Sequence, residues 1–275
     1  MNNVNLLLIE SSLDTTLKFI HFEALKRGIK SQYLNYEEIA KPWVFIPKLN
    51  VNENTIAFFA LPFTVNQVEK NYQAIRENYR FKGIVNNDML THNFLKLENK
   101  RYETYIFSKL SLPFSRFTNL HKPQFPIIAR KCISGRSKNN FLIQNQQQLD
   151  TFIRKYDVTN WIFQDYHELV GDYRIFVLGD KPLCVVKRNV KILPNKRIIV
   201  KIAEESSLPK NVLRECMELT KYIGADFLGI DIGITKNGKH FFIEYNGRAQ
   251  FKTTKEKIKS DIAEKILDYI LNKYK

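Results

Sequence analysis

Two short apolar segments near the C-terminus, residues 229–233 and 241–246, constrain the fold of this chain most strongly. An Asn-Gly pair at residues 237–238 lies between them, and Asn-Gly between apolar runs is the strongest short-range signal for a β-hairpin. We therefore expect two antiparallel strands. That pairing would place Asp231 and Glu244 on neighbouring strands, close enough to share one ion or to flank two.

The side chains on this hairpin indicate a site for a hard divalent cation. Asp231, Glu244 and Asn246 supply carboxylate and amide oxygens. Mg²⁺ prefers such ligands and usually completes its octahedron with water and substrate phosphate. A carboxylate between apolar neighbours is costly to bury unless it is paired or metal-bound. The alternative is a polar hairpin whose acids are solvated.

Length and composition bound the class of protein. The chain has 275 residues, which suits two domains or one large α/β unit. Its three cysteines are odd in number and far apart, so we expect reduced thiols. No basic segment precedes the apolar run at residues 6–9, and no segment reaches the roughly 18 apolar residues of a membrane span. We expect a cytoplasmic protein that does not enter a membrane.

The net charge of +15 favours a polyanionic partner. Nucleic acid, anionic lipid, a nucleotide and an acidic peptide would all satisfy it, whereas the codon bias of an AT-rich genome would produce the charge without any partner. A basic nucleic-acid-binding protein is an alternative from another class. Tyr33, Trp43 and Trp161 would then be available for stacking.

The N-terminal third has the pattern of an α/β unit. Apolar runs at residues 4–9 and 55–61 predict buried strands, and residues 17–27 and the segment around Tyr72 have helical spacing. No glycine-rich fingerprint follows either strand, so a dinucleotide-binding unit has little support. The polar stretch 86–99 predicts a boundary.

Closely spaced strands dominate the rest of the chain. Helices are expected at residues 100–110, 210–223 and 255–273. The short spacing between the strands favours antiparallel pairing. These strands are expected at residues 127–129, 140–143, 161–164, 172–178 and 182–188.

Basic side chains at one strand end indicate phosphate binding. Arg130 and Lys131 precede the small-residue loop 134–137. A glycine in such a loop lets backbone donors approach phosphate oxygens beside the two cations. An ordinary basic surface loop is the alternative.

The following strands indicate a purine site and further cations. Residues 161–166 run from apolar to polar, and a strand exit of this kind can sandwich an adenine ring and bind its edge. Asp172 and Arg174 point to the same side of one strand and either face a ligand or pair with each other. Lys187 and Arg188 end the next strand, and arginine is the better fork for phosphate or carboxylate.

The sequence contains no recognisable motif for nucleophilic catalysis. There is no Gly-x-Ser-x-Gly elbow, and His167 and His240 are expected to be structural or exposed. The chemistry indicated is metal-assisted phosphoryl transfer, in which positioning and charge neutralisation do most of the work.

In their order along the chain, these motifs resemble the ATP-grasp superfamily. The segments that carry the resemblance are residues 125–130, 164–166, 171–174, 229–231 and 244–246. The resemblance implies an ATP-grasp fold of mixed α/β and α+β class. An N-terminal α/β pre-ATP-grasp domain would span residues 1–95, and an ATP-grasp domain would span residues 96–275, with lobes at about 96–165 and about 166–275.

The resemblance also implies a role for individual residues. The ATP-binding residues would be Lys100, Arg130, Lys131, Gln164, Asp165, Tyr166 and Glu168. The catalytic cations would be Arg174, Lys187 and Arg188. The ligands of Mg²⁺, with Mn²⁺ as an alternative ion, would be Asp231, Glu244 and Asn246. Arg130 stands where the family usually has a lysine, so Lys131 competes with it as the phosphate contact.

The reaction implied by the resemblance is activation of a carboxylate as an acyl phosphate by ATP, followed by attack of an amine or hydroxyl. The segment after Asn246, with Arg248 and Gln250 as candidate substrate residues, departs from the ribosomal-protein glutamate ligases and is more similar to the microviridin and graspetide ligases. An acidic precursor peptide and a free amino acid or small metabolite are both open as substrates. A small-molecule kinase and a homodimer are further open alternatives.

Overall fold

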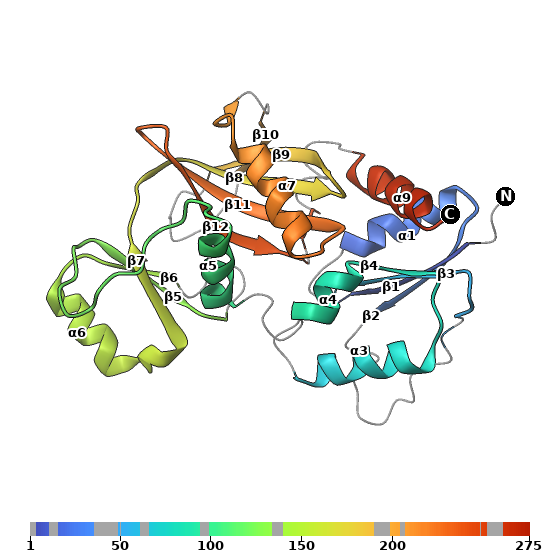
Figure 1. The fold of residues 1–275 in the computed structure, drawn as a ribbon, viewed down its shortest axis with the longest axis horizontal. Helices are drawn as coiled ribbons and strands as arrows, with labels where there is room; N and C mark the ends of the chain where they lie inside the picture. The colour runs from blue at the N-terminus through green and yellow to red at the C-terminus, as the bar shows by residue number, and fades with distance from the viewer. Residues whose placement is uncertain are drawn as a thin grey trace.

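Three β-sheets follow one another along the molecule in a computed structural model of the chain (Figure 1). A four-stranded sheet lies at one end, a three-stranded sheet at the other, and a five-stranded sheet between them. The structure describes residues 4–10, 16–35, 49, 51–60, 66–93, 99–133, 140–189, 199–203, 207–247, 249–251 and 261–275.

The N-terminal sheet is parallel, with the strand order β2-β1-β3-β4. Its strands are β1 (Asn5–Glu10), β2 (Lys30–Asn35), β3 (Thr55–Ala60) and β4 (Gly83–Val85). Parallel strands are buried on both faces, which explains the continuous apolar runs of β1 and β3. The helices of this part are α1 (Thr16–Lys26), α3 (Asn66–Asn78) and α4 (Asn87–Asn93).

The C-terminal helix α9 (Ile262–Lys273) returns to the N-terminal sheet. Its buried residues Ile266 and Ile270 pack in one core with Leu6 and Leu8 of β1, on the face that α1 also covers, and α3 covers the other face. The C-terminal part of the helix expected at residues 255–273 is therefore present as α9, while residues 255–260 lie outside the described residues. A boundary near residue 95 remains a prediction.

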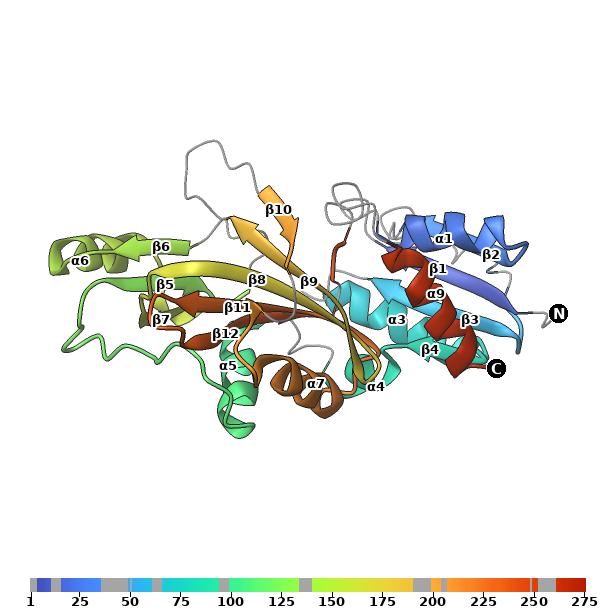
Figure 2. The ribbon, with the colours of Figure 1, turned by 90° about the horizontal axis from the view of Figure 1, so that it is seen from above.

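The central sheet is antiparallel, with the order β10-β9-β8-β11-β12. Its strands are β8 (Leu169–Leu178), β9 (Lys181–Asn189), β10 (Ile199–Ile202), β11 (Phe227–Thr235) and β12 (His240–Asn246). Helices α5 (Lys100–Lys109) and α7 (Val212–Tyr222) lie on one side of it (Figure 2). The opposite face is apolar at one end, where Phe176, Val186 and Phe227 pack in the core that contains α1 and α9. Further along the strands it carries polar side chains such as Arg174 and Asp231.

A β-bulge in β12 decides which of its side chains face the core. Asp231 pairs with Glu244, but Ile232 pairs with Phe242, so β12 carries one extra residue, Ile243, at this point. Phe242 and Tyr245 are consequently both buried in the core under the helices. Glu244 points to the opposite face.

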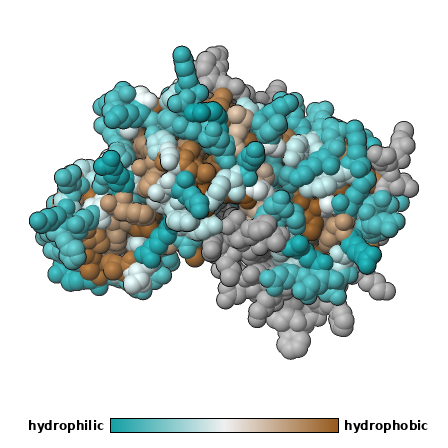
Figure 3. Space-filling model, in the orientation of Figure 1, coloured by the Kyte–Doolittle hydropathy of each residue, from teal (hydrophilic) through white to brown (hydrophobic). Residues whose placement is uncertain are grey.

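The small lobe has the strand order β6-β5-β7. Its elements are β5 (Ile127–Lys131), β6 (Asn140–Ile143), α6 (Gln146–Lys155), a short 3-10 helix (Val158–Asn160) and β7 (Trp161–Asp165). An aromatic cluster of Phe152, Trp161 and Phe163 fills its core. Apolar side chains reach the surface over this lobe (Figure 3). Leu142 and Ile153 of this lobe are each 42% exposed.

Two expectations from composition can be compared with the structure. Cys132, Cys184 and Cys216 are all free thiols, as expected. Within the described part of the chain, no helix has the length and apolar character needed to cross a membrane.

Candidate functional site

The expected hairpin is present and pairs its two acids directly. β11 and β12 are antiparallel, and Asp231 is the cross-strand partner of Glu244. The turn between them uses Gly238 at φ +76°, a conformation that favours glycine. Asp231 is 3% exposed, so the alternative of solvated acids is wrong for this residue.

Two arginines from adjacent strands hold Asp231. Arg174 of β8 donates from Nε to Oδ1 at 2.7 Å and from Nη2 to Oδ2 at 2.8 Å, a bidentate geometry. Arg188 of β9 lies 2.9 Å from the same carboxylate and also donates from Nε to Asp172 at 3.2 Å. Asp172 and Arg174 therefore pair with other residues rather than with each other.

Burial and charge act in opposite directions on the two aspartates. Burial acts to raise the pKa of Asp231, but Arg174 and Arg188 outweigh it and hold this pKa below its ordinary value. Burial raises the pKa of Asp172, an effect that Arg188 opposes and the charge of Asp231 reinforces. Asp231 is thus the carboxylate that the site keeps ionised more firmly.

Glu244 binds cations from the small lobe and from α5. Arg130 of β5, which is 7% exposed, donates from Nη2 to Glu244 at 3.1 Å and from Nη1 to the carbonyl of Ile243 at 3.0 Å. Nζ of Lys100 lies 3.7 Å from the same Glu244 oxygen. Because Ile243 is the bulged residue, its carbonyl is accessible to Arg130. Arg130 therefore ties the small lobe to β12.

The polar end of the expected adenine site, residues 164–166, which the resemblance assigns to the adenine hinge, lies against a segment that the sequence did not single out. Gln164 is buried and donates to the carbonyl of Ser115 at 2.8 Å, and its Oε1 lies 3.4 Å from Arg130. The carboxylate of Asp165 accepts from the Thr118 hydroxyl at 2.9 Å. Residues 114–118 thus orient the hinge. The only sequence signal for them is their place between Pro113 and the next strand.

Asn246 and the two acids form a donor set that fits Mg²⁺. Asn246 follows Glu244 by two residues and pairs with Gly229. Its Nδ2 is buried without a hydrogen-bond partner among the described residues. Within the same residues, no group of three or more His, Cys, Asp or Glu side chains could hold a metal. Two carboxylates, one amide oxygen and a shared phosphate would suit this ion.

Other predicted residues lie apart from these contacts. Lys131 is exposed and, as the neighbour of Arg130 on a strand, faces the other way. Lys187 pairs with Tyr173 on the helix-covered face, with Nζ 5.5 Å from its ring. Glu168 is exposed and lies 3.5 Å from Lys236 at the hairpin tip. The roles of these residues and of Tyr166 remain predictions.

One candidate substrate residue, Gln250, lies where the central sheet meets the N-terminal sheet. Gln250 is exposed and lines a narrow cavity with Thr16 and Phe58. Arg248 lies outside the described residues, as do the loop 134–138 and Trp43.

The histidines have the structural or exposed positions expected of them. His167 is exposed beside the ring of Phe241, and His240 bonds Glu215 at 2.7 Å.

The contacts described above bring together four cations, from the central sheet, α5 and the small lobe, and three carboxylates of the central sheet. The cations are Lys100, Arg130, Arg174 and Arg188, and the carboxylates are Asp172, Asp231 and Glu244. A bound anionic ligand could replace the carboxylates as the partner of these cations. A divalent cation could likewise replace the basic side chains as the partner of the carboxylates. The arrangement is thus suited to a phosphate that arrives together with a metal ion.

Comparison with known proteins gives both a family match and similar structures. A family model, the RimK-like ATP-grasp domain, matches residues 113–270. The ATP-grasp ligase PsnB, complexed with a phosphomimetic variant of a minimal precursor, Mg and ADP, has a TM-score of 0.72 and 14% identity over 100% of each chain. The macrocyclase MdnC from Microcystis aeruginosa MRC, bound with precursor peptide MdnA, has a TM-score of 0.72 and 14% identity over 98% of this chain and 100% of its own.

A third similar structure comes from a different kind of ligase. The D-alanine–D-alanine ligase from Bacillus anthracis has a TM-score of 0.64 and 12% identity over 98% of this chain and 97% of its own. No curated protein matches the sequence. The ATP-grasp fold expected from the sequence is confirmed.

Proposed function

This chain belongs to the RimK-like ATP-grasp family, and from that premise we propose that it is an ATP-dependent ligase that joins a carboxylate to an amine or hydroxyl. One observation carries the proposal. Two carboxylates on paired strands of the central sheet, Asp231 and Glu244, each contact two cations. A metal–nucleotide complex needs acidic groups for its metal ion and basic groups for its phosphates, and this arrangement offers both.

The proposed reaction has two steps. A carboxylate oxygen attacks the γ-phosphorus of ATP, the bond from that phosphorus to the bridging oxygen breaks, and ADP leaves. The nitrogen or oxygen nucleophile then attacks the acyl carbon and loses its proton, and inorganic phosphate leaves. Charge neutralisation and alignment supply most of the acceleration in phosphoryl transfer.

The residues of the site divide between the parts of the nucleotide complex. We assign Mg²⁺, which would neutralise phosphate charge when bound, to Asp231, Glu244 and Asn246. Lys100 and Arg130 hold the phosphates, and Arg174 with Arg188 orients the transferred group. The low exposure of Arg130 supports its role, since a buried cation interacts more strongly than a solvated one.

We further propose a peptide substrate whose acidic side chains provide the carboxylate. The similar structures of PsnB and MdnC contain precursor peptides, which supports this class. The net charge of +15 would attract an acidic peptide. A free amino acid is the alternative outcome of a substrate screen.

Calorimetric titration with ADP tests the proposal, with Glu244→Gln as the matched variant. Glutamine keeps the size of the side chain and an oxygen that can accept from Arg130, but it removes the charge. Wild-type protein should bind ADP more tightly with Mg²⁺ than with EDTA. The variant should keep its circular dichroism spectrum, lose most of the gain from Mg²⁺, and lose about 100-fold or more in turnover.

Two outcomes would count against the ligase. If wild-type protein binds no ADP with Mg²⁺ or with EDTA, the proposed nucleotide site is refuted. A stable phosphorylated product that never proceeds to ligation would indicate a kinase instead.

A further inference from the structure

A buried asparagine lies in the stretch that the sequence marks as a boundary. Asn86 connects β4 to α4, is 1% exposed and has φ +60°. Asparagine tolerates this left-handed conformation better than most residues do, although glycine adopts it most readily. A polar side chain buried at this point needs partners for its whole amide.

The amide of Asn86 finds these partners on the metal-ligand hairpin. Its Oδ1 accepts from the backbone N–H groups of Asp226 at 2.6 Å and Phe227 at 2.8 Å. Its Nδ2 donates to the carbonyls of Phe227 at 3.1 Å and Gly247 at 3.2 Å. Both lone pairs and both hydrogens of the amide are thus used.

These bonds close the end of the hairpin nearest the acids. The ladder between β11 and β12 ends at the pair of Gly229 and Asn246. Phe227 begins β11, and Gly247 follows the last residue of β12. One side chain therefore bridges the two strands just beyond their last paired residues.

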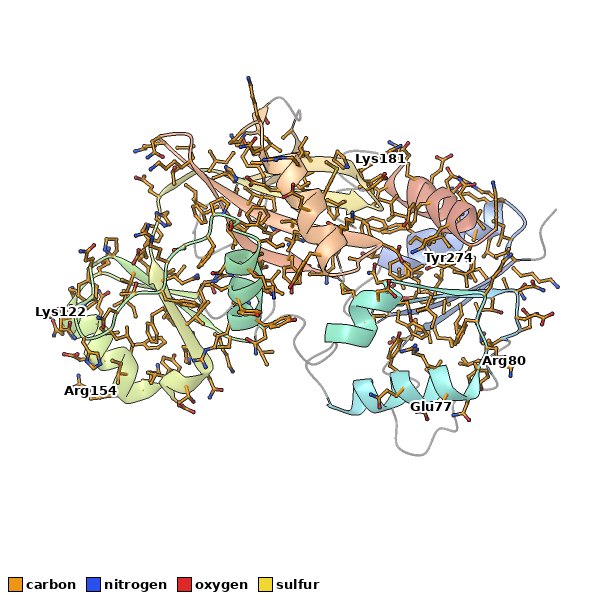
Figure 4. All side chains as sticks on the ribbon, in the orientation of Figure 1. Glu77, Arg80, Lys122, Arg154, Lys181 and Tyr274 are labelled. Carbon is orange, nitrogen blue, oxygen red and sulfur yellow. The ribbon has the colours of Figure 1, made fainter. Side chains whose placement is uncertain are left out.

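The bridge is itself anchored to the C-terminal helix. The Asp226 carboxylate accepts from the backbone N–H of Asn86 at 2.8 Å and from the Tyr269 hydroxyl at 2.9 Å, and it also binds Lys273. The hydroxyl of Tyr274, which lies beside β4 at the end of α9 in Figure 4, donates to the carbonyl of Ile84 at 2.8 Å. The position of Asn86 is consequently set from both sides.

We propose that Asn86 is a positioning residue, which holds β11 and β12 at the spacing at which Asp231 and Glu244 serve one Mg²⁺. This inference rests on the proposed metal–nucleotide function of the site. Asn86 acts through the backbone of Phe227 and Gly247. Its loss should therefore weaken the contribution of the metal to nucleotide binding and leave the metal-free contacts of ADP in place.

The test compares Asn86→Gly with Ser111→Gly. Glycine accepts the left-handed backbone at both positions, so neither change adds strain. Ser111 is the matched control because it also has a positive φ, +54°, and is exposed after α5. ADP is titrated into each protein with Mg²⁺ and with EDTA, and thermal unfolding is followed in parallel.

In EDTA, Asn86→Gly should bind ADP with the affinity of wild-type protein. The factor by which Mg²⁺ raises the affinity for ADP should be about 10-fold smaller than in wild-type protein. Ser111→Gly should keep that gain. Asn86→Asp is the second variant, because it keeps the acceptors but directs an anion at two carbonyls, and it should show the same selective loss.

An unchanged gain from Mg²⁺ in Asn86→Gly would overturn the inference, as would an equal loss of ADP binding with and without the metal. Failure of both Asn86 variants to fold would also overturn it, because the residue would then be needed for folding itself. Wild-type protein that does not bind ADP would instead refute the proposed function.

Discussion

Asp231 shows how a side chain remains ionised where burial alone would neutralise it. Two guanidinium groups surround its carboxylate, and one of them binds both oxygens. Neighbouring charge therefore outweighs desolvation at this residue, whereas desolvation prevails at Asp172. Their different surroundings thus shift the pKa values of two chemically identical side chains in opposite directions.

This separation predicts how stability depends on pH. The pKa of Asp231 is below its ordinary value of 3.8 in the folded protein, so its ionisation stabilises the fold fully above that pH. The stabilisation is lost as the pH falls through 3.8 toward the folded pKa. Urea unfolding between about pH 6 and about pH 3 measures this loss.

The comparison uses Asp172→Asn and the double variant Asp172→Asn/Asp231→Asn, so that the second acid does not titrate in either protein. The single variant should lose stability more steeply in acid. Parallel curves would show that Asp231 has no lowered pKa.

At the scale of elements, two glycines of the β11–β12 hairpin should respond differently to alanine. Gly238 has φ +76° and open space around it, so Gly238→Ala should cost about 1 kcal/mol through backbone strain alone. A Cβ on Gly229 would lie 2.7 Å from the Cβ of Ala249. Because Gly229 is paired with Asn246, Gly229→Ala should cost about 1–3 kcal/mol and also weaken ADP binding with Mg²⁺.

Urea unfolding gives the stabilities of these two variants, and ADP titration shows whether the site is disturbed. Gly238→Ala should keep the affinity of wild-type protein. Weaker ADP binding in Gly238→Ala than in Gly229→Ala would contradict this account.

The elements that the sequence predicted are those with local signals. β1, β3 and the hairpin have apolar runs or a turn dipeptide, and each is present near its expected bounds. β2 was not expected because it is polar and only half-buried, and its pairing with β1 brings it into the sheet. α6 was missed although Asn145 caps it, since its first turn is a run of glutamines.

The site was predictable in its residue types but not in its pairings. The pattern placed Arg174 on a strand but left its partner open, because that depends on the register between β8 and β11. Asn86 was hidden for the same reason. Its partners Asp226 and Phe227 lie 140 and 141 residues away in sequence.

At the scale of the whole molecule, residues from several parts of the chain complete one another. α9 finishes the core of the N-terminal sheet, and Arg130 connects the small lobe to the central sheet. Phe114 bridges to Phe242, so the segment before the small lobe also contacts β12. The site lies beside the last two of these connections, since both reach β12, the strand of Glu244.

The net charge predicts a salt dependence that differs between ligands. Binding of an acidic peptide should weaken about 10-fold or more between about 50 and about 300 mM salt, because exposed charges are screened. Binding of ADP with Mg²⁺ should change less, because Arg130 and Asp231 are buried. Fluorescence anisotropy with a labelled peptide measures the first effect, and its Asn/Gln analogue is the control. A salt-independent peptide affinity would contradict this expectation.

The bulge at Ile243 changes which face of the sheet each later residue of β12 occupies. It acts as a phase shift, because the alternation of inward and outward side chains before it is out of step with the alternation after it. Phe242 and Glu244 share a parity in sequence yet occupy opposite sides of the sheet. Deletion of this single residue would restore one continuous phase and send either the aromatic ring or the acid to the wrong side.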